Sequence, residues 1–233
     1  MTRRLAVLLF GAASLLLAAS AQPAQGGPPA LSLRYTFDGW WHGSVTDVTG
    51  RYPLQARGDL EYVRRGEGWA ARFPPRCTEG DCPRVILEGT PAPELNPGTR
   101  GVRFGASVLM TAADTGDGAN VVQKGFSTGG VTQLKLQVDG RAGQPSCVVA
   151  SKTTIYRAVA RVNVADGRWH ALACFRSGRW LAIEVDGTQR AAVTMPPSVS
   201  IVNSEPLRIG GKSVSVDNDQ YAGQLDDVFL TID

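Results

Sequence analysis

The chain has 233 residues with 24 Lys or Arg and 21 Asp or Glu, and its formal net charge is +3. Two of the basic residues, Arg3 and Arg4, belong to the N-terminal stretch, so 22 of the 24 remain beyond it against 21 acidic residues. This balance provides no strong positive field, which argues against binding to nucleic acid or to an anionic membrane surface.

Residues 1–21 have the organisation of a secretory signal peptide. Arg3 and Arg4 give a positive start, Leu5–Leu17 is apolar, and Ala19-Ser20-Ala21 is a small-residue cleavage site. The apolar run is too short for a membrane span. We therefore expect a secreted, extracellular protein without a membrane span, whose mature chain begins with a flexible Pro- and Gly-rich leader over residues 22–30.

From residue 31 onward the sequence predicts β-strands and turns. Apolar residues alternate with polar ones in Thr132–Val138 and again in Trp180–Asp186, where Glu184 falls on the outward side. The dipeptides Asp139-Gly140 and Asp186-Gly187 follow these segments and favour hairpin turns. Further strands are expected at Leu33–Phe37, Leu60–Val63, Ala70–Phe73, Gly101–Met110, Asn120–Lys124, Ser146–Ala150, Ile155–Val162, Arg168–Arg176, Pro206–Ile209 and Gly223–Ile232. This pattern predicts one all-β domain over residues 31–233, with two packed antiparallel sheets.

The chain contains four cysteines, and an even number in an exported protein predicts disulfides. Of the three possible connectivities we favour Cys77–Cys82, within one short loop, and Cys147–Cys174, which would join two strands. The alternative is a zinc site made of all four cysteines. The spacing does not contain the paired C-x-x-C knuckles that such sites use.

Five segments together resemble the laminin-G-like family of concanavalin A-like jelly rolls. Asp166–Leu172 (DGRWHAL) and Gly178–Gly187, which ends in VDG, are similar to the central hairpin of that family. Tyr35–Asp38 resembles its first strand, Asp47–Gly50 the segment after it, and Gly223–Val228 its closing strand. The resemblance covers nearly the whole mature chain and implies a two-sheet antiparallel jelly-roll sandwich with the first and last strands side by side.

The resemblance also implies a calcium ion near the paired terminal strands. Calcium takes six to eight oxygen ligands, and the resemblance points to Asp38 and Asp226, then Asp47, as the residues that would bind it. The alternative is that Asp38 and Asp47 form turns and that Asp226 caps a loop backbone.

Aromatic side chains are the candidates for ligand binding, because the apolar faces of sugars stack on flat rings. The candidates are Trp40, Trp180, Tyr156 and Tyr221, of which Trp180 falls on the outward side of its strand. The alternative is that each of these rings belongs to the core of the sandwich.

No complete catalytic constellation is visible in the sequence. Glucanases related to this family use an E-x-D-x-E strand, whereas Glu184-Val185-Asp186 lacks the second Glu and continues into a turn. The sequence has two His residues and no G-x-S-x-G motif, which argues against a serine-nucleophile triad.

We therefore expect a secreted, non-catalytic module that binds carbohydrate or a glycoprotein, assisted by calcium. The alternatives are an adhesive cell-envelope domain that binds protein and a divergent glycoside hydrolase.

Overall fold

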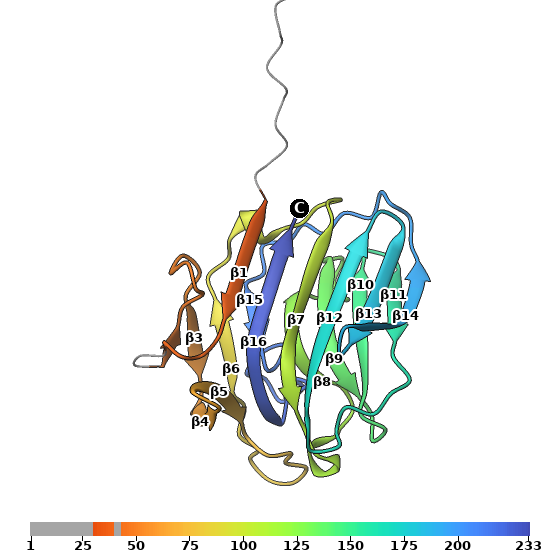
Figure 1. The fold of residues 1–233 in the computed structure, drawn as a ribbon. Coiled ribbons are helices and arrows are strands. Elements are labelled where there is room, and N and C mark those ends of the chain that lie inside the picture. Colours follow the sequence, from red (N-terminus) through yellow and green to blue (C-terminus); the bar gives the residue numbers. More distant parts are fainter. Residues whose placement is uncertain (1–29, 40–42) are drawn as a thin grey trace, which may run out of the picture.

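The computed structural model describes residues 30–39 and 43–233, and within them the fold is a sandwich of two antiparallel sheets (Figure 1). The front sheet has the order β14 (Thr188–Thr194), β13 (Trp180–Val185), β12 (Trp169–Ser177), β7 (Val102–Leu109), β16 (Gly223–Ile232), β5 (Gly68–Phe73), β4 (Glu61–Arg65), and β1 (Leu31–Tyr35) also pairs with β16. The rear sheet has the order β11 (Ile155–Val159), β10 (Gln144–Ala150), β9 (Gln133–Asp139), β8 (Ala119–Gly125), β15 (Leu207–Ile209), β6 (Ile86–Gly89), β3 (Leu54–Arg57), β2 (Ser44–Val45). Two short 3-10 helices are formed by Pro93–Leu95 and Ala112–Asp114.

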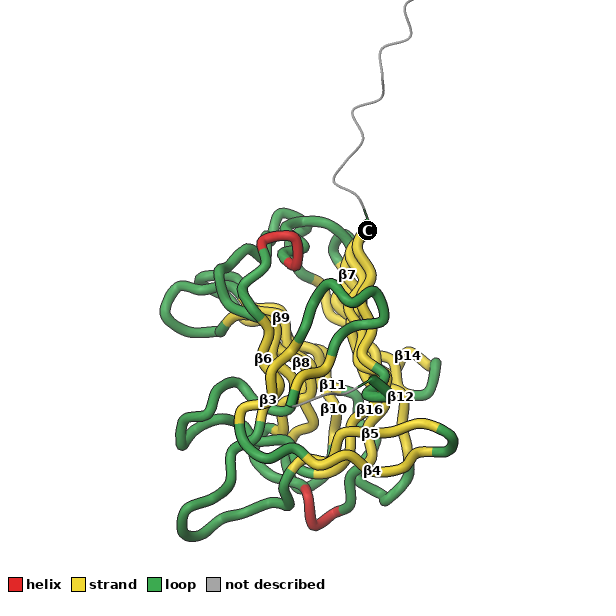
Figure 2. Tube along the Cα trace, turned by 90° about the vertical axis from the view of Figure 1, so that its left-hand side faces the viewer, coloured by secondary structure: helices red, strands yellow, loops and turns green. Residues whose placement is uncertain are grey.

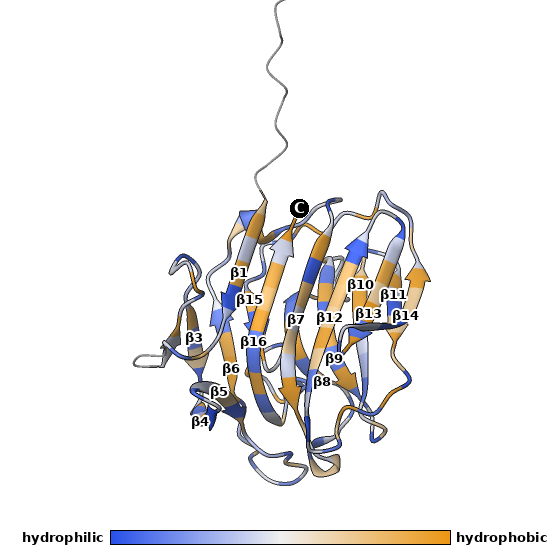
Figure 3. Cartoon of the chain, in the orientation of Figure 1, coloured by the Kyte–Doolittle hydropathy of each residue, from blue (hydrophilic) through white to orange (hydrophobic). Residues whose placement is uncertain are grey.

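The core lies between the two sheets, as the alternation of the sequence predicts. Leu134 and Leu136 of β9 in the rear sheet and Leu181 and Ile183 of β13 in the front sheet belong to one continuous apolar cluster, and all four are fully buried. Along β7 and β16 in Figure 3, apolar residues are interspersed with polar ones, as expected for strands with one face on the core. Figure 2 shows the rear sheet (β6, β8, β9) and the front sheet (β7, β12, β14) as two separate layers.

A buried disulfide joins the two layers. Cys147 lies on β10 of the rear sheet and Cys174 on β12 of the front sheet, both fully buried, with their Cα atoms 5.5 Å apart. The second disulfide, Cys77–Cys82, closes an exposed loop. Both pairings that the sequence favoured are confirmed.

The two expected D-G turns have different structures. Asp186 and Gly187 have φ values of 52° and 72° and form a two-residue turn between β13 and β14. This backbone matches the twist of the flanking strands. The turn expected at Asp139-Gly140 is confirmed, and its loop is the longer of the two, because Asp139 pairs with Gln144 and the loop spans residues 140–143.

The first and last strands lie side by side, as the jelly-roll resemblance implies (Figure 1). Leu31 pairs with Ile232 and Tyr35 with Val228, so β1 completes one side of β16. On that same side β5 pairs with the start of β16, and β7 pairs with β16 along its other side. In the described part of the chain, no helix is long and apolar enough to cross a membrane.

Candidate functional site

An open groove crosses the outer face of the front sheet, the face turned to the viewer in Figure 1. Its volume is about 550 Å³. We call it the front groove and define it by its polar and aromatic lining: Arg34, Arg103, Ser107, Glu184, Asp227 and Phe229. These residues come from β1, β7, β13 and β16, so the groove depends on the pairing of strands that are far apart in sequence.

Strand register sets the floor of the front groove. One row of outward-facing residues runs across five strands in the order Glu184, Ala173, Gly105, Phe229, Arg34. The middle of the row is low because Ala173 and Gly105 carry a methyl group and a hydrogen atom. A Cβ atom on Gly105 would lie 2.8 Å from Cε1 of Phe229, which shows that this ring leans over the glycine. The half-buried Phe229 ring therefore forms part of the floor.

Two ion pairs flank this floor. Arg34 Nη2 lies 2.5 Å from Asp227 Oδ1, and Arg103 Nη2 lies 2.5 Å from Glu184 Oε2. Both guanidinium groups remain open to solvent, because the side chains of Arg34 and Arg103 are 55% and 47% exposed. The groove therefore presents donors and acceptors at two places, with an aromatic ring between them.

A β-bulge directs Asp227 into the groove. The register between β16 and β7 shifts between Asp226 and Phe229, and Asp227 has a φ of 51°. A non-glycine residue in this left-handed region costs about 1 kcal/mol, so the rest of the fold must hold it in place. Asp227 accepts hydrogen bonds from Arg34, Arg65 and the Ser107 hydroxyl. Burial opposes its ionisation, but the two arginines outweigh burial and lower the pKa of Asp227.

Arg65 fixes one end of the groove from β4. Its Nη1 donates to Asp226 Oδ2 at 2.5 Å and to Asp227 Oδ2 at 2.9 Å. Its guanidinium carbon lies 4.1 Å from the centre of the Trp169 ring, a cation–π contact. Burial raises the pKa of Asp226, and the ion pair with Arg65 opposes that increase. Arg65 thus connects β4, β16 and β12.

His170, on β12, bridges the carboxylates of Asp166 and Asp186. Its Nδ1 lies 2.8 Å from Asp186 Oδ2 and its Nε2 lies 3.0 Å from Asp166 Oδ1. Burial lowers the pKa of His170, but the hydrogen bonds to the two carboxylates outweigh burial and raise it. The next residue, Ala171, lines the groove, so this bridge stabilises the groove edge.

The structure does not gather the three residues predicted to bind calcium. Asp226 is paired with Arg65, and Asp38 Oδ1 accepts a hydrogen bond from the backbone N–H of Trp69. Asp47 is 2% exposed and caps the following turn, where it accepts the backbone N–H groups of residues 49, 51 and 52. Over residues 30–39 and 43–233, no three His, Cys, Asp or Glu side chains cluster as metal ligands. The arrangement of these residues fits the turn-forming alternative, and calcium binding stays a prediction.

The three predicted aromatic residues that the structure describes do not line the front groove. Tyr221 is fully buried with its ring edge against Phe73, so the prediction that it contacts a ligand is wrong; apolar burial explains its position. Trp180 is 49% exposed at the start of β13, on the outward side as predicted. Tyr156 lines a separate shallow cavity together with hydroxyl side chains such as Ser151. Trp40 lies outside the described residues.

The outer face of the rear sheet is also polar, and we call it the rear polar face. Its side chains are hydrogen-bonded to one another. Asp139 accepts hydrogen bonds from Gln137, Ser146 and Arg157, and Asn120 donates to the side chain of Gln123. Four of these residues (Asn120, Gln123, Gln137 and Ser146) are buried although they point away from the core.

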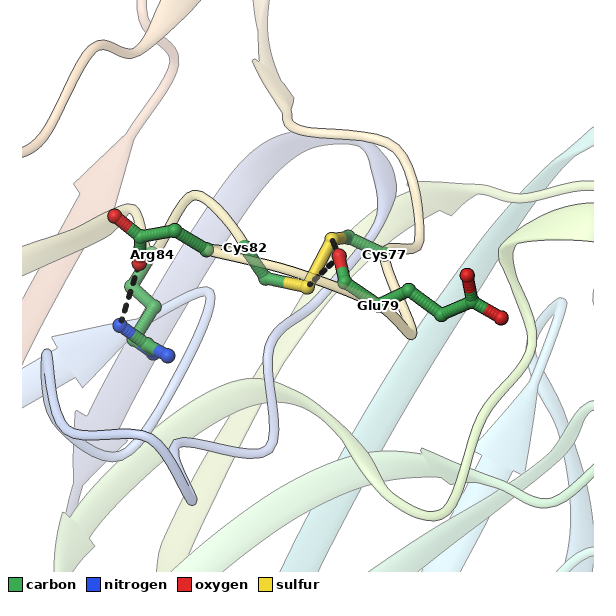
Figure 4. The surroundings of a disulfide bond; sticks show 5 residues. Cys77, Glu79, Cys82 and Arg84 are labelled. Carbon is green, nitrogen blue, oxygen red and sulfur yellow. Dashed lines mark hydrogen bonds and ion pairs between the residues drawn. A yellow bond between two sulfur atoms is a disulfide. The ribbon is translucent and has the colours of Figure 1, made fainter.

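A third cavity, of about 390 Å³, lies at the loop end of the sandwich beside the Cys77–Cys82 disulfide (Figure 4). Figure 4 shows Arg84 beside this loop, where it lies 3.9 Å from Asp81. Asp114 also lines the cavity, and its carboxylate caps a 3-10 helix by accepting from the backbone and hydroxyl of Thr111. This role is structural.

Comparison with known proteins identifies the class to which this fold and groove belong. A two-sheet antiparallel sandwich with adjoining terminal strands is a jelly-roll architecture. A laminin-G-type model of the concanavalin A-like lectin/glucanases superfamily matches residues 104–230, more than half of the chain. The protein belongs to that superfamily. No functionally curated protein matches the sequence.

Solved structures with the same fold are distant in sequence. Domain 4 of AbnA, a GH43 extracellular arabinanase from Geobacillus stearothermophilus in complex with arabinotriose, has a TM-score of 0.63 at 15% identity, and the match covers 86% of this chain and 91% of that one. The binding domain of Paraclostridial Mosquitocidal Protein 1 has a TM-score of 0.62 at 9% identity, over 85% and 48%. The binding domain of Botulinum Neurotoxin DC in complex with SialylT has a TM-score of 0.58 at 9% identity, and the match covers 85% of this chain and 47% of that one. The chain spans about half the length of the two toxin domains, and the likeness shows the fold alone.

Proposed function

We propose that the protein is a secreted, non-catalytic module that binds carbohydrate in the front groove. The observation that carries this proposal is the Phe229 ring on a low floor between two ion pairs whose arginines are about half exposed. Sugar rings have apolar C–H faces that pack on aromatic rings, while their hydroxyls need donors and acceptors at the margins. The front groove offers both kinds of contact.

Relatives of the same fold support binding as the kind of function. The arabinanase domain was solved with arabinotriose, and a neurotoxin binding domain was solved with SialylT. Another neurotoxin of this group depends on two ganglioside molecules for cell entry. Those ligands belong to those proteins, and a glycoconjugate is the kind of partner that they suggest here. The signal-like N-terminus and the two disulfides support secretion.

The environment of Glu184 supports a role without catalysis. Its carboxylate is engaged by Arg103, and the adjoining Asp186 accepts hydrogen bonds from His170 and from the backbone of Ala171. A glycosidase needs one carboxyl that holds a proton and another that is free to attack or to activate water. Measuring polysaccharide hydrolysis by the wild type and by Glu184→Gln checks this point, and we expect neither protein to release product. Turnover that is lost in Glu184→Gln would establish a hydrolase instead.

A glycan array followed by titration calorimetry tests the binding site. We expect Phe229→Ala to weaken binding to the best glycan at least tenfold, because removing an aromatic platform costs about 1.4 kcal/mol or more. Trp180→Ala is the matched control, since Trp180 lies on the same sheet outside the groove, and it should bind like the wild type. Loss of binding in Trp180→Ala alone would move the site to that ring. No binding to any glycan would overturn the proposal and favour a protein-binding adhesive domain.

A further inference from the structure

Each charged side chain that lines the front groove forms an ion pair with a side chain of opposite charge. Arg34 is paired with Asp227 and Arg103 with Glu184, and below them Arg65 is paired with Asp226. An anionic sugar that approached Arg34 or Arg103 would also approach the carboxylate that already neutralises that arginine, and a cationic amino sugar would likewise approach an arginine. Among the described residues that line the groove, no charge is unpaired, so net electrostatic attraction favours neither kind of ligand.

The ion pairs still have spare hydrogen-bonding capacity. Arg103 uses Nη2 for Glu184 Oε2, and its other N–H groups and Glu184 Oε1 have no partner among the described residues. Arg34 likewise uses Nη2 for Asp227 Oδ1. A guanidinium group has five N–H donors, so most of those on Arg34 and Arg103 remain available. A donor beside an acceptor matches two neighbouring hydroxyls on an uncharged sugar ring, each of which both donates and accepts.

The row of residues on the floor gives the groove a direction and a length. It extends from Glu184 on β13 to Arg34 on β1 and crosses the strands at right angles. Five neighbouring strands are separated by four intervals of about 4.8 Å each, so the row is about 19 Å long. That length suits several linked sugar units, and the Phe229 ring lies within the row, not at its end.

We infer that the front groove binds the uncharged interior of an oligosaccharide that lies across the strands, and that its paired charges discriminate against acidic sugars. This inference rests on the proposed carbohydrate-binding function. The Phe229 ring contacts an inner sugar unit, and the Arg103–Glu184 and Arg34–Asp227 pairs contact hydroxyls of the units on either side.

Calorimetric titration with matched glycans tests this inference. Neutral oligosaccharides of increasing length are compared with counterparts of the same linkage that carry a uronate, sulfate or sialate group, at low and high salt. We expect neutral glycans to bind at least tenfold more tightly than acidic ones. Affinity should increase with length beyond a single sugar and change less than twofold with salt, because no net charge is neutralised.

Glu184→Gln is the decisive variant because it leaves Arg103 without its carboxylate partner. We expect it to gain at least fivefold in affinity for the carboxylated glycan, and this gain should disappear at high salt. Glu88→Gln is the matched control, because Glu88 is paired with Arg208 on the rear sheet, away from the groove. It should leave both affinities unchanged.

The outcomes separate the two proposals. Tightest binding of an acidic glycan by the wild type would overturn this inference and leave the proposed function standing. An unchanged preference in a folded Glu184→Gln protein would overturn the role of the paired charges. No binding to any glycan, neutral or acidic, would overturn the proposed function itself. If Glu184→Gln does not fold, Glu184→Ser serves in its place, with the same expectations.

Discussion

The two outer faces of the sandwich are both polar, but their polar groups are used differently. On the rear polar face, Asn120, Gln123 and Ser146 are at most 1% exposed, and each is hydrogen-bonded to a neighbouring side chain. In the front groove, Arg34 and Arg103 are about half exposed and keep spare donors. Polar groups that satisfy one another stabilise a surface, whereas polar groups with spare capacity are available to a ligand. Buried polar networks should therefore matter for stability, and the front groove for binding.

The largest expected effect follows from removing the centre of the rear network. Asp139→Ala deletes the shared acceptor of Gln137, Ser146 and Arg157, and leaves buried donors without partners. We expect the free energy of unfolding to fall by about 3 kcal/mol, measured by urea denaturation. Asp117→Ala, at an exposed loop position, is the control and should change it by less than about 0.5 kcal/mol. A loss below 1 kcal/mol in Asp139→Ala would show that the two faces do not differ in this way.

An intermediate effect is expected at His170, which stabilises the edge of the front groove. Its pKa is raised in the folded protein, so its stabilising contribution is complete below its unfolded pKa of about 6.5 and is lost as the pH rises through the folded pKa. The melting temperature should therefore decrease as the pH increases from about 6 to 8. In His170→Gln this part of the decrease should be absent, while His42 is retained in both proteins. Parallel pH curves for the two proteins would contradict the prediction.

The smallest effect on stability is expected within the front groove. Glu184→Gln removes one partner of a partly exposed ion pair and keeps an amide that can still accept from Arg103, and surface ion pairs contribute about 0–1 kcal/mol. We expect the free energy of unfolding to change by less than about 1 kcal/mol, so that binding changes in this variant report on the groove and not on folding. A loss as large as that of Asp139→Ala would mean that the groove is part of the structural framework.

Local patterns were sufficient to predict much of the fold. Alternation assigned Leu181 and Ile183 to the core and Glu184 to the surface, and the structure confirms each assignment. Short strands escaped prediction: β2, β3 and β6 have two to four residues each, too few to show a period. The turn after Asp139 was predicted but the length of its loop was not, because a D-G dipeptide alone does not determine where pairing resumes.

The front groove could not be predicted from the sequence. Phe229, Arg34 and Arg103 become neighbours only through the register of β16 with β1 and β7, which joins segments about 200 and about 125 residues apart along the chain. The bulge at Asp227 shifts that register, and no glycine marks it in the sequence. One signal was present: the outward position of Glu184, which the structure places at the end of the floor row.

The position of β16 has a consequence for how the molecule is made. It is the last strand of the chain and yet hydrogen-bonds with β1, β5 and β7 in the middle of the front sheet. During synthesis these three strands emerge first and have edges without their β16 partner until β16 itself has been synthesised. Native assembly of the front sheet is therefore postponed until its middle strand is available.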